Sequence, residues 1–189
     1  MHSISVVLDG PSKVEINCAE KLTQQRLTRG DMTIAPYQFS IEGAQVEACE
    51  FLQLWLNPSI IDRAAKELGL DEGVALVPVL GVVDPLAEQT IYQLEEELTT
   101  GPRRDYGHVL VDTLSKHLVR YYAEGTWTRN NVGGFPKYLL DSVLAYIEDN
   151  WRPNLSPDEI ANSIGVHPER FARAFKAATG KGIHHYLKK

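Results

Sequence analysis

The spacing of the apolar residues changes once along this chain, near Pro58, and that change limits the folds it can adopt. Before Pro58 the apolar residues form short runs typical of β-strands, bounded by turn residues, at 4–8, 13–16, 32–35 and 50–56. After Pro58 they recur at the i, i+3, i+4, i+7 spacing of amphipathic helices. The pattern predicts an α+β fold that is mostly α, in which a partial antiparallel sheet is followed by helices.

Two of these segments carry specific expectations about burial. The run 50–56 has few polar positions, so it is predicted to be a strand buried on both faces. In the segment that begins at Pro85, Leu98 is expected to face inward and the glutamates 95–97 to face solvent. The predicted helices of this central region span 58–68, 85–98 and about 106–122.

An Asn- and Gly-rich stretch at 130–134 then interrupts the helical pattern and is typical of a linker. It divides the chain into a β region, a helical region that continues it, a linker and a last module. Their predicted bounds are 1–57, 58–125, 126–134 and 135–189.

Charge is distributed unevenly over these parts. The net charge is −6, and residues 1–134 hold 11 Lys and Arg against 19 Asp and Glu, whereas residues 135–189 hold 8 against 6. An acidic front and a mildly basic back indicate two modules with different partners. Cys18 and Cys49 are too few for a disulfide scaffold, and no signal peptide or apolar run of membrane-spanning length is present, so a cytoplasmic protein without membrane association is expected.

The last module has the pattern of a helix-turn-helix. Ser156 and Glu159 form a capping box for a short helix, and Gly165 provides a turn. A second amphipathic helix runs from Pro168 to Thr179, with Gly180 suited to a left-handed C-cap. Such a pair can place its second helix in the DNA major groove, although a three-helix bundle with one charged face has the same pattern.

The second helix of this pair separates into two faces. Phe171, Ala174, Phe175 and Ala178 are predicted to form its core side. The opposite face presents Glu169, Ala172, Arg173 and Lys176.

Each residue of this second face suits a contact with DNA. Arg173 can pair bidentately with guanine, Glu169 can accept a hydrogen bond from cytosine N4, and Ala172 can touch a thymine methyl. Arg170 and Lys176 are predicted phosphate contacts, and Asn154 and Ser156 near the first helix are predicted to position another phosphate.

The stretch LLDSVLAYIEDNWRPNLSPDEIANSIGVHPERFARAFKAATGKGIHHYL resembles the first half of the DNA-binding domain of AraC/XylS-type transcription regulators. Its elements YIEDNW, LSPDEIA, PERFARAFK and TG follow the order and spacing of that family. His167 and Ile183 depart from it, at positions where the family usually has serine and proline. The resemblance implies that Glu169, Ala172 and Arg173 face the bases. It also implies a second helix-turn-helix, so the chain is expected to be truncated after the first.

The segment GDMTIAP at 30–36 resembles the hairpin of a cupin-type barrel, the sensory domain common in these regulators. The resemblance implies a partial cupin-like domain that senses a small-molecule effector of unknown identity and forms a homodimer. Residues 38–40 contain no histidine, so neither a metal nor another cofactor is expected there.

The preferred reading is a sequence-specific, DNA-binding transcription regulator, not an enzyme. Two alternatives stay open: a ligand-binding or dimerisation protein without specific DNA binding of its own, and a small cupin enzyme. The second is disfavoured because no histidine cluster, phosphate loop, GxSxG or HExxH motif is present.

Overall fold

Two antiparallel sheets form the first part of the protein, in a computed structural model that describes residues 1–18, 21–39, 42–45, 48–70, 73–101, 104–124 and 135–188. The larger sheet has the strand order β6 (Glu50–Leu56), β1 (His2–Asp9), β4 (Met32–Ala35), β7 (Val79–Val82). The smaller has the order β3 (Lys21–Leu27), β2 (Ser12–Cys18), β5 (Glu42–Gln45). Both consist of antiparallel pairs.

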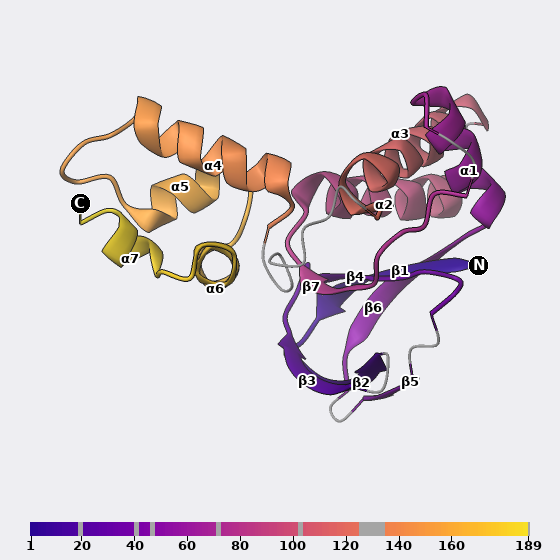
Figure 1. Cartoon of the computed structure of the whole chain (residues 1–189), viewed down its shortest axis with the longest axis horizontal. Helices are drawn as coiled ribbons and strands as arrows, with labels where there is room; N and C mark the ends of the chain where they lie inside the picture. Colours follow the sequence, from indigo (N-terminus) through magenta and orange to yellow (C-terminus); the bar gives the residue numbers. More distant parts are fainter. Residues whose placement is uncertain are drawn as a thin grey trace.

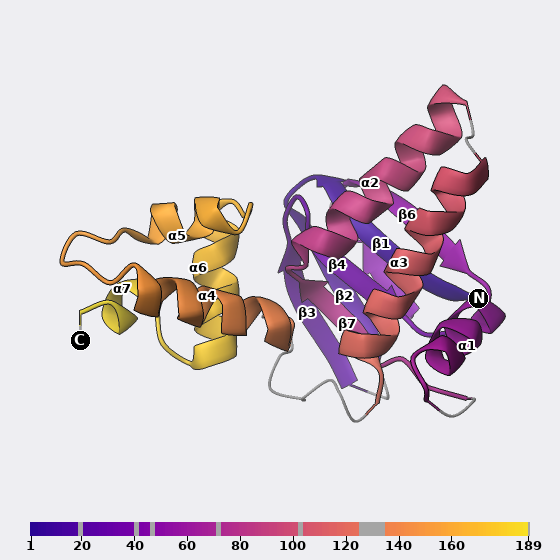
Figure 2. The ribbon, with the colours of Figure 1, turned by 90° about the horizontal axis from the view of Figure 1, so that it is seen from above.

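Helices cover one face of the larger sheet, and the smaller sheet lies on its other side (Figures 1 and 2). Strand β1 shows why, since Ile4 and Val6 are fully buried while the alternate residues Ser3 and Ser5 are only half-buried. The buried side chains of β1 and β4 join those of three helices in one hydrophobic core. These helices are α1 (Pro58–Glu67), α2 (Pro85–Thr100) and α3 (Arg104–Tyr122).

The remaining helices form a second unit, at the left of Figure 1, whose hydrophobic core also includes the buried Val83 that follows β7. They are α4 (Lys137–Asp149), α5 (Pro157–Ser163), α6 (Pro168–Thr179) and the short α7 (Ile183–Tyr186). The predicted α+β class is therefore confirmed. The predicted linker 126–134 falls outside the described residues. No helix in the parts of the chain that the structure describes is both long and apolar enough to cross a membrane.

Two predictions about burial are wrong. Strand β6 is an edge strand, so it is not buried on both faces, and Phe51 and Trp55 are 46% and 55% exposed. In α2 the inward face runs from Ala87 through Leu94 to Glu97, so Glu97 is buried whereas Leu98 is 74% exposed. Residue 97 lies one turn after Leu94 on the same face of the helix, so it points inward although its side chain is a glutamate.

The predicted strands do not include three that the structure contains. Strand β3 is mostly polar, and β5 has four residues, one of which is Gly43. Strand β7 has four residues, one of which is Gly81 with a φ of +65°. Strand β3 pairs with β2 and β7 with β4, and the Gln25 side chain of β3 donates a hydrogen bond to the Leu80 carbonyl of β7 at 3.3 Å, which connects the two sheets.

Candidate nucleic-acid interface

Local capping sets the geometry of the α5–turn–α6 pair. The Ser156 hydroxyl accepts a hydrogen bond from the Glu159 backbone N–H at 3.2 Å, which is the predicted N-cap. The Glu159 carboxylate does not complete the capping box but pairs with Arg152 at 2.6 Å. Gly165 in the turn and Gly180 after α6 have φ of +68° and +73°, which only glycine adopts without strain.

The core face of α6 lies where the sequence predicts it at Phe171, Ala174 and Phe175, whereas Ala178 is only half-buried. Phe171, Ala174 and Phe175 are fully buried, in one cluster with Ile160 of α5 and side chains of α4. The Phe171 and Phe175 rings stand 5.7 Å apart, and Phe171 also packs on Phe135. This packing fixes which face of α6 points away from its own module.

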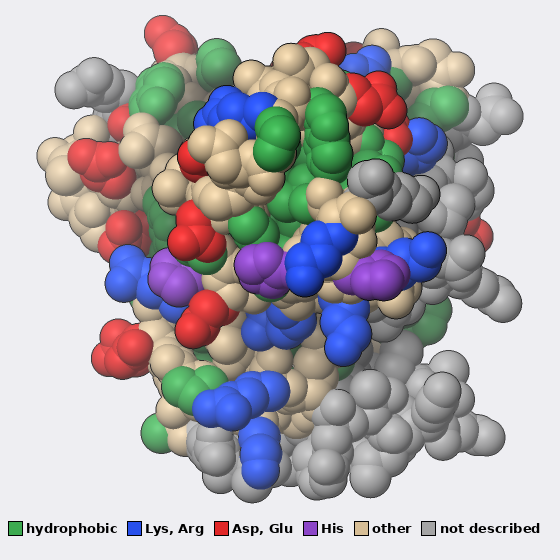
Figure 3. All heavy atoms as spheres, turned by 90° about the vertical axis from the view of Figure 1, so that its left-hand side faces the viewer, with side chains coloured by type: hydrophobic (Ala, Val, Ile, Leu, Met, Phe, Trp, Pro, Cys, Tyr) green, Lys and Arg blue, Asp and Glu red, His purple; other side chains and the backbone are tan. Residues whose placement is uncertain are grey.

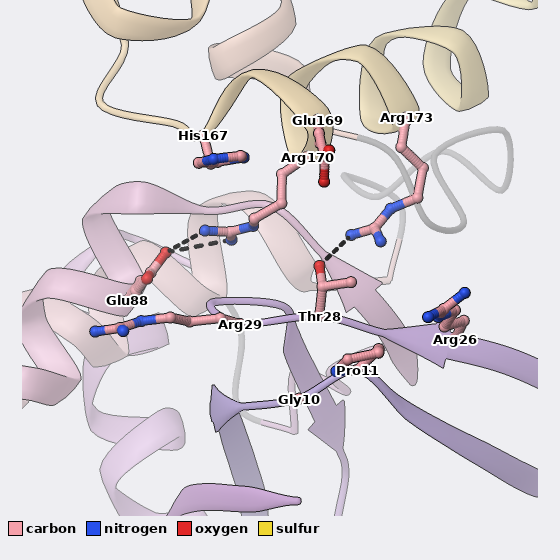
Figure 4. A pocket seen from close by; sticks show the side chains of 10 residues that line it. All are labelled: Gly10, Pro11, Arg26, Thr28, Arg29, Glu88, His167, Glu169, Arg170 and Arg173. Atoms are coloured by element: carbon pink, nitrogen blue, oxygen red, sulfur yellow. Dashed lines mark hydrogen bonds and ion pairs between the residues drawn. The ribbon is translucent and has the colours of Figure 1, made fainter.

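The predicted DNA-contacting residues do not share one environment. Glu169 and Lys176 are exposed, and Ala172 is half-buried against the core of the module. Asn154 is exposed, whereas Ser156 is half-buried with its hydroxyl engaged in the cap. Arg170 and Arg173 contact the N-terminal unit (Figure 4).

Arg173 forms an ion pair with a buried carboxylate of the sheet unit. Its Nη2 donates to Asp31 Oδ1 and Oδ2 at 2.7 and 2.6 Å, and to Thr28 Oγ1 at 3.1 Å. Asp31 is 1% exposed, whereas the Arg173 side chain is 38% exposed. Its guanidinium therefore still reaches solvent on one side.

Arg170 is enclosed more fully, with 9% of the residue exposed. Its Nη2 donates to the Gly30 carbonyl at 2.5 Å, and Nη1 pairs with Glu88 Oε2 of α2 at 3.2 Å. Asp31 Oδ1 lies 3.6 Å from Arg170 Nε, too far for a hydrogen bond. One arginine thus joins α6 to both the sheet unit and its helices.

The turn before β4 is shaped to receive these arginines. Gly30 has a φ of +81°, and a Cβ at this position would meet the Arg170 guanidinium and the Glu88 carboxylate. The Asp31 carboxylate also accepts from the Thr28 backbone N–H at 2.7 Å, which holds it in the turn. Burial raises the pKa of Asp31, and the Thr28 hydrogen bond and the charges of Arg173 and Arg170 offset part of that rise.

A second contact between the units is centred on Asp84, the N-cap residue of α2. Its Oδ1 accepts from the Ala87 N–H at 3.1 Å and from the Tyr138 hydroxyl of α4 at 2.7 Å. Its Oδ2 accepts from Tyr122 at 2.5 Å and lies 2.7 Å from His117 Nε2. Burial opposes ionisation, but the hydrogen bonds of His117, Tyr122 and Tyr138 outweigh it and lower the pKa of Asp84.

A cavity of about 430 Å³ lies on the other side of the larger sheet, between it and the smaller sheet. Its walls combine apolar side chains with a few hydroxyl and amide groups, among them Phe51, Trp55, Ser3, Thr33 and Gln53. Among the residues with described positions, no group of three or more His, Cys, Asp or Glu side chains is placed to hold a metal ion.

The residues that receive α6 have no signal in the sequence. Gly30 and Asp31 read as an ordinary turn, and Glu88 as one acidic residue in the first turn of a helix. The hydrogen bond from Arg173 to Asp31 spans 142 positions, and the ion pair of Arg170 with Glu88 spans 82. No local pattern reports a contact at that separation.

No protein-family model matches the chain, and no curated protein matches it. Among solved structures, the chain is similar to the AraC-like transcriptional activator CuxR, with 14% sequence identity and a TM-score of 0.43. The similarity covers 99% of this chain and 64% of that protein, so this chain spans about two thirds of its length.

Proposed function

We propose that this protein is a sequence-specific, DNA-binding transcription regulator of AraC type whose α6 is the recognition helix. The observation that carries the proposal is the division of α6 into two faces. Phe171, Ala174 and Phe175 are buried in the module, while Glu169, Arg173 and Lys176 point away from its core. Together with a capped α5 and a glycine turn, this is the arrangement that helix-turn-helix proteins use in the major groove.

The roles of the side chains follow from their chemistry. Arg173 reads a guanine, Glu169 a cytosine and Ala172 a thymine methyl. Lys176 and Arg170 neutralise phosphates, and Asn154 and the N-terminus of α5 at Ser156 position another. Figure 3 faces the end of the molecule that carries this module, where Lys, Arg and His side chains gather in a band. Such a band favours attraction of a polyanion to this end of an otherwise acidic chain.

DNA binding then requires a change in the position of α6. While α6 contacts the N-terminal unit, an arrangement here called docked, Arg170 is buried against Glu88 and Gly30 and Arg173 is held on Asp31, so this face of α6 cannot enter a major groove. DNA competes with the carboxylates of Glu88 and Asp31 for the same guanidinium groups. The docked arrangement therefore lowers the affinity for DNA.

The cavity between the two sheets is the proposed effector site of a partial cupin-like sensory unit. Its apolar walls and few hydroxyl and amide groups fit a small neutral molecule. Because the same two-sheet unit carries Asp31, an effector that shifts the strands alters the surface on which α6 docks.

A second candidate is a ligand-binding protein without specific DNA binding of its own. The observation that favours it is the burial of Arg170, which removes one predicted phosphate contact. A single helix-turn-helix makes few base contacts, so its affinity for specific DNA can be too low for regulation. Specific DNA binding by this chain favours the regulator, and its absence favours the ligand-binding protein.

The experiment is selection of a binding site from random-sequence DNA, followed by gel shifts of the selected and a scrambled duplex over a salt series. Arg173→Ala is expected to lower discrimination at one base pair by about 1–3 kcal/mol. Lys176→Ala is expected to weaken both duplexes alike and to reduce the salt dependence by about one counterion.

Lys66→Ala is the matched control, because Lys66 is an exposed lysine on α1, outside the α4–α7 module. Asp31→Asn, which releases Arg173, is expected to tighten binding to the selected duplex. The proposal fails if no sequence is enriched, or if Lys176→Ala and Lys66→Ala behave identically.

A further inference from the structure

Strand β6 forms one edge of the larger sheet, and in the parts of the chain that the structure describes it pairs only with β1. The hydrogen bonds of β1 show which backbone groups of β6 face outward. Val7 of β1 accepts from the Gly30 N–H at 2.7 Å and donates to the Asp31 carbonyl at 3.1 Å, so its backbone faces β4. Because this direction alternates along a strand, the backbone groups of Val6 and Ile4 face β6.

The same alternation defines the outer edge of β6. Leu52 and Leu54 lie opposite Val6 and Ile4 and direct their backbone groups to β1. The N–H and carbonyl groups at positions 51, 53 and 55 therefore point outward, and no hydrogen bond joins them to the backbone of a described residue. Such a row of unpaired donors and acceptors is a template for another strand.

The side chains of this edge suit pairing with an identical strand. Edge strands are commonly protected from pairing by lysine, proline or a charged residue, and the sequence FLQLW at 51–55 has none of these. It also has the same order of residue types in both directions, namely aromatic, leucine, glutamine, leucine, aromatic. An antiparallel pair of such strands places Gln53 opposite itself, Phe51 opposite Trp55, and Leu52 opposite Leu54.

Both faces of β6 offer apolar surface beside this edge. On the helix side, Leu52 and Leu54 line a cavity of about 230 Å³ together with Leu98 of α2. On the other side, Phe51 and Trp55 line the cavity between the two sheets and are largely exposed. The end of α2 that carries Leu98 projects beyond the sheet on the side of β6 (Figure 2), so it lies where a strand would be added.

We propose that β6 pairs with β6 of a second copy of this chain, antiparallel and with Gln53 of one copy opposite Gln53 of the other. The two larger sheets then form one continuous sheet, joined by the outward backbone groups at 51, 53 and 55. Phe51 of each copy packs on Trp55 of the other on one face of the sheet, and Leu52 packs on Leu54 on the opposite face. The centre of the interface is uncharged, which suits two chains that each carry a net charge of −6.

The pairing brings the second copy to the cavity between the sheets. Its Phe51 and Trp55 side chains lie beside Trp55 and Phe51 at the rim of that cavity. A ligand that contacts both copies then stabilises the dimer. This coupling rests on the proposed effector site, whereas the strand pairing does not, and the experiments below need neither DNA nor effector.

Sedimentation of the full chain over a concentration series measures the pairing. The wild-type chain is expected to dimerise, and Gln53→Lys is expected to weaken the dimer by about tenfold or more, because two lysines would stand opposite each other. Gln89→Lys is the matched control, since Gln89 is an exposed glutamine on α2, and it is expected to leave the dissociation constant unchanged. A monomeric wild type would overturn the second copy as the occupant of this edge, and a Gln53→Lys dimer as stable as wild type would overturn the pairing.

Cross-linking tests the register, in a chain in which Cys18 and Cys49 are replaced by serine and circular dichroism verifies folding. Gln53→Cys is expected to give a covalent dimer with a short bifunctional maleimide, because the two cysteines lie opposite each other. Glu50→Cys is the control on the same strand, since its two cysteines would lie about 20 Å apart at about 3.4 Å per residue. Equally efficient cross-linking of both variants, or none of Gln53→Cys, would overturn the register.

Amide hydrogen exchange separates strand pairing from a contact between the ends of α2 alone. The amides of Phe51, Gln53 and Trp55 are expected to exchange about tenfold or more slowly in the dimer than in the monomer, because they become hydrogen-bonded. Those of Leu52 and Leu54 bond to β1 in both states and serve as the internal control. A dimer in which the three outward amides exchange as fast as in the monomer would overturn the proposal.

Discussion

At the scale of single residues, two buried carboxylates join the two halves of the chain and differ in electrostatic character. Asp84 receives hydrogen bonds from Tyr122 and Tyr138 and lies against His117, and these lower its pKa despite burial. The pKa of Asp31 is raised, because burial outweighs the hydrogen bonds of Thr28 and the arginine charges. The surroundings of Asp84 thus favour its ionised form, whereas burial disfavours the ionised form of Asp31.

The lowered pKa of Asp84 predicts how the free energy of unfolding depends on pH. Because the folded pKa lies below the unfolded value of about 3.9, the ionised carboxylate stabilises the fold above that pH, and the contribution is lost as the pH falls through the folded pKa. Asp84→Asn, which keeps an N-cap, is expected to lower the free energy of unfolding at pH 7 by about 3 kcal/mol.

Urea unfolding at a series of pH values measures this difference. It is expected to shrink as the pH is lowered below about 3.9. Asp141→Asn is the control, since Asp141 is an exposed partner of Lys137 and its loss costs at most about 0.5 kcal/mol. A pH of about 2 lies well below the unfolded pKa of an aspartate. If the difference in free energy of unfolding between wild type and Asp84→Asn stays constant down to that pH, Asp84 does not stabilise the fold through its ionised form.

At the scale of elements, α6 ends through the backbone conformation of Gly180 and through the Thr179 hydroxyl, which donates to the Phe175 carbonyl at 2.7 Å and accepts from the Lys181 N–H at 3.3 Å. Gly180 adopts a left-handed conformation, and its N–H bonds to the Lys176 carbonyl at 2.8 Å. A Cβ there would meet no atom within 4 Å, so any cost of substitution comes from the backbone.

A pair of glycine substitutions tests this view of the helix end. Gly180→Ala is expected to destabilise the protein by about 1 kcal/mol, because alanine is strained at a φ of +73°. Gly107→Ala is expected to stabilise it by up to about 1 kcal/mol, because Gly107 lies inside α3 and a Cβ there would only touch Glu97 Cγ at 3.8 Å. Opposite shifts of the thermal midpoint are the expected result, and shifts of the same sign would contradict it.

At the scale of the whole molecule, the ends of α2 and α3 that meet near residue 101 project beyond the sheet (Figure 2). This tip exposes three large side chains, Leu98 at 74%, Val109 at 59% and Tyr106 at 42%. Because exposed apolar side chains are typical of an interface, we predict that the homodimer expected through the N-terminal half uses this tip.

Sedimentation of Leu98→Asp tests this dimer. We expect the wild-type chain to be a dimer and the variant a monomer, because an interface does not tolerate an unpaired charge at its centre. Leu70→Asp is the control, as Leu70 is a half-exposed leucine that follows α1. A monomeric wild type, or the same effect from both variants, would argue against the tip as the interface.

Local patterns in the sequence predict the longer helices, the periodic strands and most of the core of the last module. These features depend on local spacing, as in α2, where Asp84 and Pro85 mark the start, and in α6, where Gly180 marks the end. Local spacing failed where pairing decides, as in the polar strand β3, and where sheet order decides, as in the edge strand β6.

The direction in which the charged face of α6 points is set by tertiary contacts. The sequence identified Arg170 and Arg173 as cations on a helix surface and assigned both to DNA. Their contacts with Glu88, Gly30 and Asp31 depend on how two separately packed units meet, and an ion pair between residues 142 positions apart leaves no periodicity to detect. The spacing of apolar residues predicts which face of a helix is buried in the core of its module. It does not predict ion pairs between charged side chains that are far apart in the sequence, because these depend only on how the chain folds.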